Sequence, residues 1–215
     1  MRRYSSNLAS ATPSLLLWVL SACGGRAPAA APPSGGAFAF DYVLEATIFK
    51  IDVVHVNLQI DSGTVRTVKA LVSSGNRTRA LEDSVGAALM ETPTANARLT
   101  FLVAIPAQQF VENTAEILRD MGEEGLLASS EVEHLVRSSR QRFAFLDEAG
   151  IAPGDYVEQV LRGDSVTTTF ITSLGERRLH DIQVGREHRI ALLGSYFAKT
   201  SDFRDGLLDQ VFGIR

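Results

Sequence analysis

The stretch from Glu45 to Ile60, EATIFKIDVVHVNLQI, constrains the fold of this chain more than any other segment. Apolar residues alternate with polar ones along it, which is the period-2 pattern of a β-strand with one buried face. The alternation changes phase at the adjacent pair Val53 and Val54, so the apolar side chains before and after this pair belong to opposite faces. A long strand that bends through a β-bulge has this property. Bulges are frequent both at sheet edges and beside functional sites, and the pattern fits either position.

Further strands are expected on both sides of this stretch. Ala37–Leu44 alternates as well and is expected to lead into the long strand. Asp61-Ser62-Gly63 is a turn signal, and the alternating residues Thr64–Val72 predict the hairpin partner of the long strand. Asn96–Ile105 is mostly apolar and predicts a central strand that is buried on both faces. Three short strands are expected near the C-terminus, at Asp155–Arg162, Ser165–Ser173 and Glu176–Val184.

Helical patterns separate these strands. A short helix is predicted at Arg79–Met90, and Pro106 suits the first position of the next one, whose apolar stripe runs from Phe110 to Met121. Ser130 is the expected N-cap of a further helix. The chain is expected to close with two short helices, Arg186–Ala198 and Asp202–Phe212. This order of elements predicts an α+β fold, in which an antiparallel sheet with a long bent strand carries helices packed on one face.

Residues 1–23 have the pattern of a targeting segment, with Arg2 and Arg3 before an apolar run, LLLWVL, that is too short to span a bilayer. The sequence Leu20-Ser21-Ala22-Cys23 resembles the lipobox of bacterial lipoprotein signal peptides, [LVI]-[AST]-[GA]-C, and ends on the only cysteine of the chain. The resemblance implies that Cys23 is lipidated and becomes the first residue of the mature protein. The alternative is an ordinary secretory leader that is cleaved near Ala22.

The lipobox resemblance also implies an address for the protein. Acyl chains on Cys23 would hold the chain at the bacterial cell envelope. Residue Gly24 follows the cysteine, whereas in such signal peptides an aspartate at this position retains the protein in the inner membrane; an outer-membrane location facing the periplasm is therefore expected. Residues 24–36, GGRAPAAAPPSGG, predict a disordered tether because they offer nothing to bury. Residues 37–215 are expected to form one domain.

Composition excludes several classes of function. The 21 basic and 25 acidic residues leave a net charge of −4, which argues against nucleic acid as a partner. A single cysteine permits no intrachain disulfide and no multi-cysteine metal site. The four histidines lack metal-ligand spacing, and no phosphate-binding or dinucleotide-binding glycine motif occurs, so neither a metal nor a cofactor is predicted. Residues Arg140 and Arg142 are interpreted as surface charges, and His180 and His188 as structural or solvated.

Three stretches resemble the chalcone isomerase-like superfamily. Lys50–Leu58, KIDVVHVNL, is similar to K-F-T-A-I-G-V-Y-L of the plant members, and Ala97–Met121 is similar to the family's strand and following helix. Gly154–Leu208 matches best, with G-D-x-V, a hairpin, a helix and a terminal leucine pattern. The resemblance extends over Ala37–Phe212. It implies a long-stranded antiparallel sheet packed against a layer of helices, with a ligand cleft between them.

The residues that carry catalysis in that family do not match here. In the plant members an arginine, a threonine, a tyrosine and an asparagine line the cleft, orient a flavonoid phenolate and stabilise its charge. These positions fall on Phe40, Asp52, Pro106 and Asn113, of which only Asn113 keeps the expected residue type. An ionised Asp52 would repel a phenolate. The chain is therefore predicted not to cyclise chalcones, and no catalytic residue is assigned.

Lys50, Asp52 and Asn113 are the candidate ligand-binding residues. Lys50 and Asp52 are same-face neighbours on the long strand, and the alternative for this pair is an exposed ion pair of little energetic consequence. Asn113 is three residues after Phe110 and four before Ile117, so helical spacing places it beside the buried stripe. There it either lies at the rim in water or turns into the cleft between sheet and helices.

These observations predict a membrane-anchored domain that binds a small apolar or fatty-acid-like ligand between sheet and helices, without catalysis. Two alternatives remain open. One is an isomerase, an intramolecular lyase of the chalcone isomerase type, with a divergent site at Lys50, Asp52 and Asn113. The other is a structural envelope lipoprotein whose cleft is filled by its own side chains. The volume and the lining of the cleft distinguish these alternatives.

Overall fold

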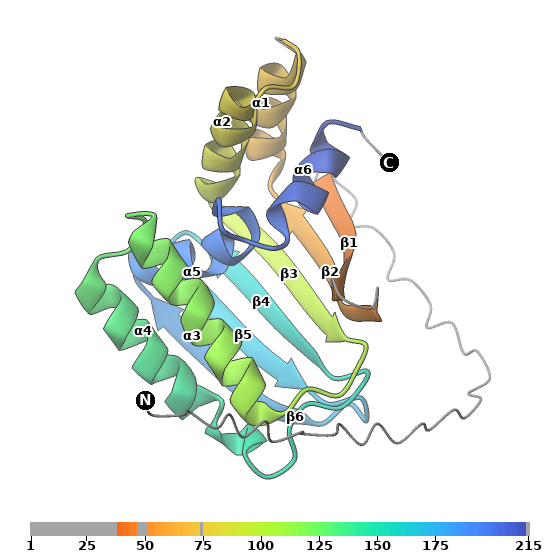
Figure 1. The fold of residues 1–215 in the computed structure, drawn as a ribbon, viewed down its shortest axis with the longest axis vertical. Helices are drawn as coiled ribbons and strands as arrows, with labels where there is room; N and C mark the ends of the chain where they lie inside the picture. The colour runs from red at the N-terminus through yellow and green to blue at the C-terminus, as the bar shows by residue number, and fades with distance from the viewer. Residues whose placement is uncertain (1–37, 47–50, 74, 214–215) are drawn as a thin grey trace, which may run out of the picture. The chain divides into compact units, whose positions relative to one another are not determined.

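One antiparallel sheet of six strands forms the centre of the computed structural model, which describes residues 38–46, 51–73 and 75–213 (Figure 1). Each strand pairs with the next along the chain, so the order in the sheet is the order in the sequence. The strands are β1 Phe38–Ala46, β2 Ile51–Ile60, β3 Thr94–Phe101, β4 Tyr156–Arg162, β5 Ser165–Ile171 and β6 Arg177–Val184.

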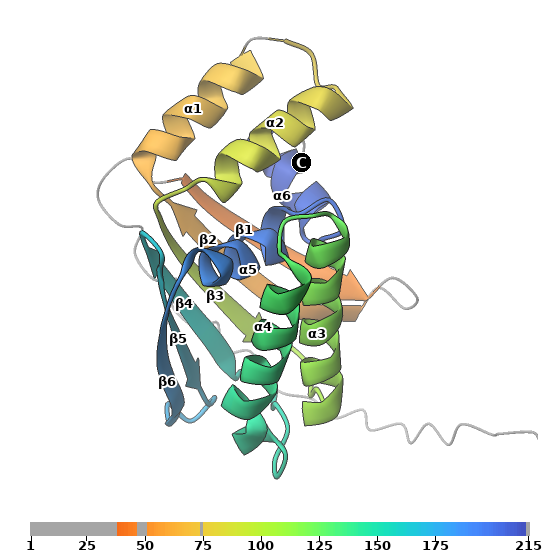
Figure 2. The same cartoon turned by 90° about the vertical axis from the view of Figure 1, so that its left-hand side faces the viewer.

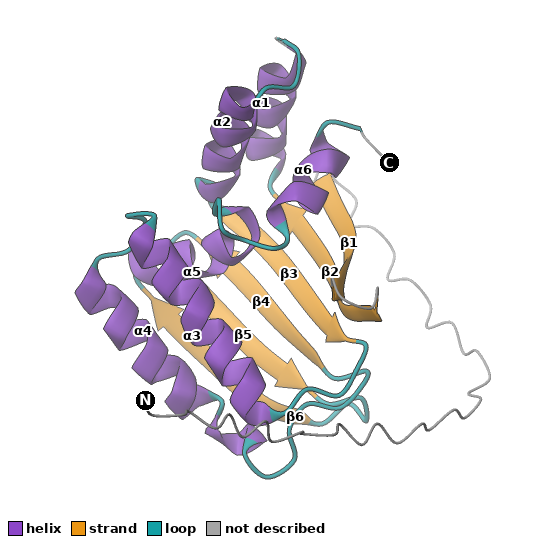
Figure 3. Ribbon diagram, in the orientation of Figure 1, coloured by secondary structure: helices purple, strands orange, loops and turns teal. Residues whose placement is uncertain are grey.

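The helices occupy one face and one end of this sheet. Helices α3 to α6 lie over a single face, whereas α1 and α2 form a hairpin at one end of it (Figures 1 and 2). Figure 3 shows the resulting two layers, with the strands behind the helices. The predicted α+β architecture is confirmed. The helices are α1 Ser62–Ser73, α2 Arg79–Met90, α3 Ala107–Glu123, α4 Ser129–Arg142, α5 Arg186–Phe197 and α6 Arg204–Val211.

The predicted bulge lies where the alternation changes phase. Leu44 of β1 pairs with Val54, but the next residue, Glu45, pairs with Asp52, so Val53 is the extra residue on β2. The prediction of one strand from Glu45 to Ile60 is nevertheless wrong, because Glu45 and Ala46 belong to β1, which pairs with β2. Residues 47–50 include no Gly, Pro, Asn or Asp, the residues that usually signal a turn. The alternation of apolar and polar residues therefore gave no sign that one strand ends and another begins there.

The predicted hairpin strand Thr64–Val72 is also wrong, because this segment is part of helix α1. Asp61 begins the helix: its Oδ1 accepts hydrogen bonds from backbone N–H groups of the first turn at 2.7 and 3.0 Å. Val65 and Val68 are both buried, which is the spacing of one helical face rather than of one strand face. The partner of β2 is instead β3, which follows the α1–α2 hairpin.

Strand β3 departs from its prediction in burial. Ala95, Ala97 and Phe101 are buried, whereas Asn96 and Arg98 are exposed. Only one face of the strand is therefore buried. In the described part of the chain, the helices cover the face of the sheet opposite to that of Asn96 and Arg98. The strand also ends at Phe101 rather than at the predicted Ile105, and the N-cap of α4 is Ala128 rather than the predicted Ser130. Most other predicted boundaries agree with the structure to within three residues.

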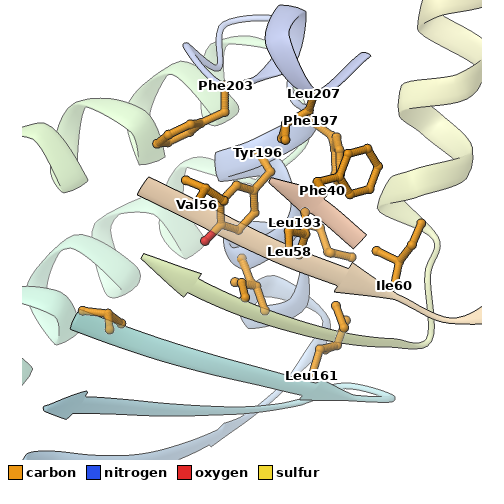
Figure 4. Close-up of a cluster of buried hydrophobic side chains, with 14 of the residues drawn as sticks. Phe40, Val56, Leu58, Ile60, Leu161, Leu193, Tyr196, Phe197, Phe203 and Leu207 are labelled. Atoms are coloured by element: carbon orange, nitrogen blue, oxygen red, sulfur yellow. The ribbon is translucent and has the colours of Figure 1, made fainter. Parts of the chain in front are cut away.

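The core lies between the helix-facing side of the sheet and helix α5. Val56 and Leu58 of β2 contribute from the sheet, and Leu193 and Phe197 contribute from α5 (Figure 4). Each of these four side chains is fully buried. Burial of such apolar side chains stabilises the fold by about 1.5–3 kcal/mol each. This packing positions α5 across the sheet. Other residues of α5 line the cavity that is described next.

Candidate functional site

A cavity of about 510 Å³ lies between the sheet and helices α3, α4 and α5. This volume is within the range of small-molecule sites in proteins. The cleft between sheet and helices that the family resemblance implied is thus present. Most of its wall is apolar, and the larger apolar side chains that line it are Val54, Leu99, Phe101, Val157 and Val166 from the sheet, and Phe110, Leu118, Leu135, Phe143 and Leu192 from the helical side.

A row of polar side chains crosses the helix-facing side of the sheet. Gln159 of β4 pairs with Thr168 of β5, and Thr168 pairs with Asp181 of β6. Directly opposed residues in an antiparallel sheet point to the same side, so the three side chains are neighbours. Gln159 and Thr168 line the cavity, and Thr168 is only 1% exposed. The cavity therefore has mainly apolar walls, and a strip of polar side chains crosses the sheet at its floor.

Arg142 closes this strip from the side of helix α4. Its Nε lies 3.1 Å from Oδ2 of Asp181, but the approach does not have the geometry of a hydrogen bond. Its Nη2 donates a hydrogen bond to Oγ of Ser138 at 3.2 Å, and Nε2 of Gln183 donates to the same oxygen at 3.1 Å. Burial lowers the pKa of Arg142 and the Asp181 carboxylate raises it, yet an arginine remains charged at physiological pH.

His188 lies in the first turn of α5 and adds a titratable group to the same wall. Its ring is buried, and its Nε2 lies 3.5 Å from Oε1 of Glu187. Burial lowers the pKa of His188 below its ordinary value of 6.5, Glu187 and Asp181 oppose this shift, and Arg142 and His134 reinforce it. At pH 7 the ring is therefore neutral, and it presents both a donor and an acceptor nitrogen.

Tyr196 places a hydroxyl group in the core beside the cavity. The side chain is fully buried, and its Oη has no hydrogen-bond partner among the residues that the structure describes. In Figure 4 the hydroxyl points away from Phe40 and Phe197, while the ring packs against Phe203 with centroids 5.7 Å apart. Burial raises the pKa of Tyr196, so the hydroxyl stays protonated. A buried donor without an acceptor is uncommon in proteins and costs about 1–3 kcal/mol.

The residues singled out from the sequence have different places in the structure. Asn113 of α3 lines the cavity, and its side chain is exposed at the rim. Asp52 is in β2, but its side chain is outside the described part, and Lys50 and Cys23 lie outside the described residues altogether. The roles of Lys50, Asp52 and Asn113 in ligand binding remain predictions. Phe40, at the position of the family's arginine, is fully buried in the core.

Sequence reasoning missed the polar strip and the side chains that meet it. The interpretation of Arg142 as a surface charge is wrong, because its side chain is 12% exposed. Gln159 and Thr168 carried a usable signal: each interrupts the apolar alternation of its strand, and the hairpin turn sets them opposite each other. No comparable signal existed for Arg142 or His188, since charged residues at helix ends are usually exposed.

Two searches of the described residues were negative. They contain no group of three or more His, Cys, Asp or Glu side chains that could hold a metal ion. None of the helices described in the structure is both long and apolar enough to cross a membrane.

A scan against protein-family models finds no match to this chain, and a search of curated proteins finds no relative. Among solved structures, the chain is similar to the crystal structure of an Arabidopsis thaliana fatty-acid binding protein, AtFAP1. The sequences are 15% identical, and the superposition covers 82% of this chain and 88% of the plant protein with a TM-score of 0.48.

Proposed function

We propose that this protein binds a small, mainly apolar ligand in the cavity between its sheet and helices α3, α4 and α5. The cavity itself supports this function: its volume is about 510 Å³, and aromatic and aliphatic side chains dominate its wall. Ligand sites in proteins have this make-up, with a few polar groups that fix the orientation of the ligand. A fatty-acid-like molecule suits such a site because its chain would contact the apolar wall along its length.

We favour binding without catalysis because only Asn113 keeps the residue type of the plant family's catalytic positions, and because the polar side chains of the cavity are not arranged as an activated nucleophile either. Nucleophilic catalysis requires a hydroxyl or thiol within hydrogen-bond reach of a base such as histidine. The hydroxyls of Thr114, Ser195 and Ser201 donate instead to backbone carbonyl groups, and that of Thr200 donates to Glu124. Among the described residues, no cavity-lining hydroxyl is hydrogen-bonded to a histidine.

We further propose that the protein acts at the bacterial cell envelope, anchored through lipidated Cys23. The lipobox sequence Leu20–Cys23 and the apolar run before it support this address. Residues 24–36 would then separate the binding domain from the membrane surface.

Native mass spectrometry and calorimetric titration of the purified full chain test ligand binding. We expect the wild-type protein to retain an amphiphile or to take up added 1-dodecanol. Ala191→Phe should reduce occupancy, because Ala191 lines the cavity and a phenyl ring would fill part of it. Ala87→Phe is the matched control, since Ala87 is exposed on α2. A wild-type protein that binds neither 1-dodecanol nor dodecanoate, or equal binding by both variants, would contradict the proposed function.

A further inference from the structure

Arg142 brings a positive charge into a wall that is otherwise mainly apolar. The residue is in the last turn of α4, its side chain is 12% exposed, and it lines the cavity. Its guanidinium carbon lies 5.8 Å from the centre of the Phe143 ring. Placing a guanidinium in such surroundings is unfavourable unless its N–H groups find acceptors.

The acceptors that surround Arg142 do not account for all its donors. A guanidinium has five N–H groups. One N–H of Nη2 donates to Ser138, and Nε–H faces Asp181 without the geometry of a hydrogen bond. None of the residues that the structure describes accepts a hydrogen bond from Nη1. Three N–H groups of the terminal nitrogens therefore remain for another acceptor, and this planar fork is suited to the two oxygens of a carboxylate.

The surroundings of Arg142 include features that favour and oppose an incoming anion. His188 is in the first turn of α5, where the positive end of the helix dipole favours negative charge. The carboxylates of Asp181 and Glu187 oppose it. Asp181 is 36% exposed, so solvent screens its charge, and Arg142 already offsets that charge. An anion with a single charge is therefore favoured over one with two.

An aromatic cluster adjoins Arg142 and continues the apolar wall. Phe143 packs against Phe110 with ring centroids 5.0 Å apart, and Phe110 packs against Phe101 with centroids 5.8 Å apart. All three rings line the cavity. In the described part of the chain, Arg142 is the only arginine or lysine that lines the cavity, whose lining also includes the acidic residues Glu116, Asp120 and Asp202, and it lies at one end of a continuous aromatic surface.

We infer that the ligand is a monocarboxylate amphiphile, whose head group accepts hydrogen bonds from the terminal N–H groups of Arg142 while its chain lies on Phe143, Phe110 and Phe101. This inference rests on the proposed function and adds to it the charge of the head group and the residue that binds it. It assigns the head group to Arg142 of helix α4, whereas the sequence pointed to Lys50, Asp52 and Asn113.

A matched pair of ligands tests the inference. We would titrate the full chain calorimetrically with dodecanoate and with 1-dodecanol, below the concentrations at which they aggregate. The wild-type protein should bind dodecanoate about tenfold more tightly or better, because a carboxylate accepts charge-assisted hydrogen bonds from a guanidinium that are stronger than those accepted by an alcohol. Arg142→Gln should lose about tenfold in affinity for dodecanoate and leave the affinity for 1-dodecanol unchanged. Arg140→Gln, which removes an exposed charge two residues away, should behave as wild type.

The outcomes separate this inference from the function on which it rests. Equal affinity of the wild-type protein for the two ligands would overturn the carboxylate site but not the cavity. Equal weakening of both ligands by Arg142→Gln would do the same, as would an equal effect of Arg140→Gln. If the wild-type protein binds neither dodecanoate nor 1-dodecanol, both proposals are overturned. Should Arg142→Gln unfold, Arg142→Lys retains the charge without the planar fork, and we expect it to bind dodecanoate more weakly than wild type and 1-dodecanol equally well. Unchanged affinity for dodecanoate in Arg142→Lys would overturn the paired hydrogen bonds proposed for the head group.

Discussion

Nε of Arg142 lies 3.1 Å from Oδ2 of Asp181, and this ion pair joins helix α4 to the edge strand β6. The two partners differ in burial, because the arginine side chain is 12% exposed and the aspartate side chain is 36% exposed. Loss of the aspartate would leave a largely buried cation with a single hydrogen bond, to Ser138. The pair therefore contributes to stability as well as to the charge of the cavity.

Asp181→Ala should lower the free energy of unfolding by about 1–3 kcal/mol, because a buried charged group loses its partner. Urea unfolding measures this change. Glu176→Ala is the control: Glu176 is 63% exposed and 3.7 Å from Arg178, so its loss should cost less than about 1 kcal/mol. Equal effects of the two substitutions would show that the Arg142–Asp181 pair makes no special contribution.

Tyr196→Phe should leave the fold intact and raise the free energy of unfolding of the ligand-free protein by about 1–3 kcal/mol. The substitution removes a buried hydroxyl that has no partner among the described residues. Thr64→Val removes a hydroxyl that is satisfied, since Thr64 donates to Asp61 at 2.7 Å, and should destabilise the protein. Thermal unfolding of both variants checks the contrast. A loss of stability in Tyr196→Phe as large as that in Thr64→Val would contradict it.

His188 should make stability depend on pH on the acidic side of neutrality. Its pKa is lowered in the folded protein, chiefly by burial, from the ordinary value of 6.5. The unfolded chain therefore binds the proton first as the pH falls, and stability decreases from pH 6.5 down to the folded-state pKa, while it is unaffected above about pH 7.5. Melting temperatures of wild type and His188→Gln between pH 5 and 8 test this. The same slope in both proteins would contradict the assignment, and His180→Gln, at an exposed histidine, is the control.

Cys23→Ser should abolish lipidation and stable retention at the membrane, because the thiol is the attachment point that the lipobox resemblance implies. Metabolic labelling with palmitate, followed by membrane fractionation, measures both effects. Label that persists in Cys23→Ser, or a wild-type protein found only in the soluble fraction, would show that the chain is not a lipoprotein.

Local signals sufficed for many elements of the fold. The strands β4 and β5 begin and end close to their predicted residues because Gly163, at a φ of 61°, supplies a turn conformation that a glycine adopts without strain. The Gly154-Asp155 motif that resembled the chalcone isomerase-like family has a local role too. Asp155 is buried, and its carboxylate accepts backbone hydrogen bonds from Ala152 and Ser173 at 2.8 and 2.7 Å.

Local signals failed where one pattern fits two structures. Residues 64–72 alternate like a strand and also place Val65 and Val68 on one side of a helix. The helix is selected by Asp61, which caps its first turn and is held in place by the hydroxyls of Thr64 and Thr92. Thr92 is far along the chain, just before β3, so its contact with Asp61 exists only after the α1–α2 hairpin has formed.

Amphipathic periodicity, turn residues and capping residues are properties of neighbours along the chain, and they were enough to predict the α+β class, whereas the cleft was expected only from the family resemblance. The site inside that cleft depends on pairing between distant segments. Gln159, Thr168 and Asp181 become neighbours only through the register of three strands, and Arg142 meets them only because α4 packs beside β6. A charged residue at a helix end has the same sequence pattern whether water or a cavity surrounds it, so its burial is decided by the packing of helix on sheet.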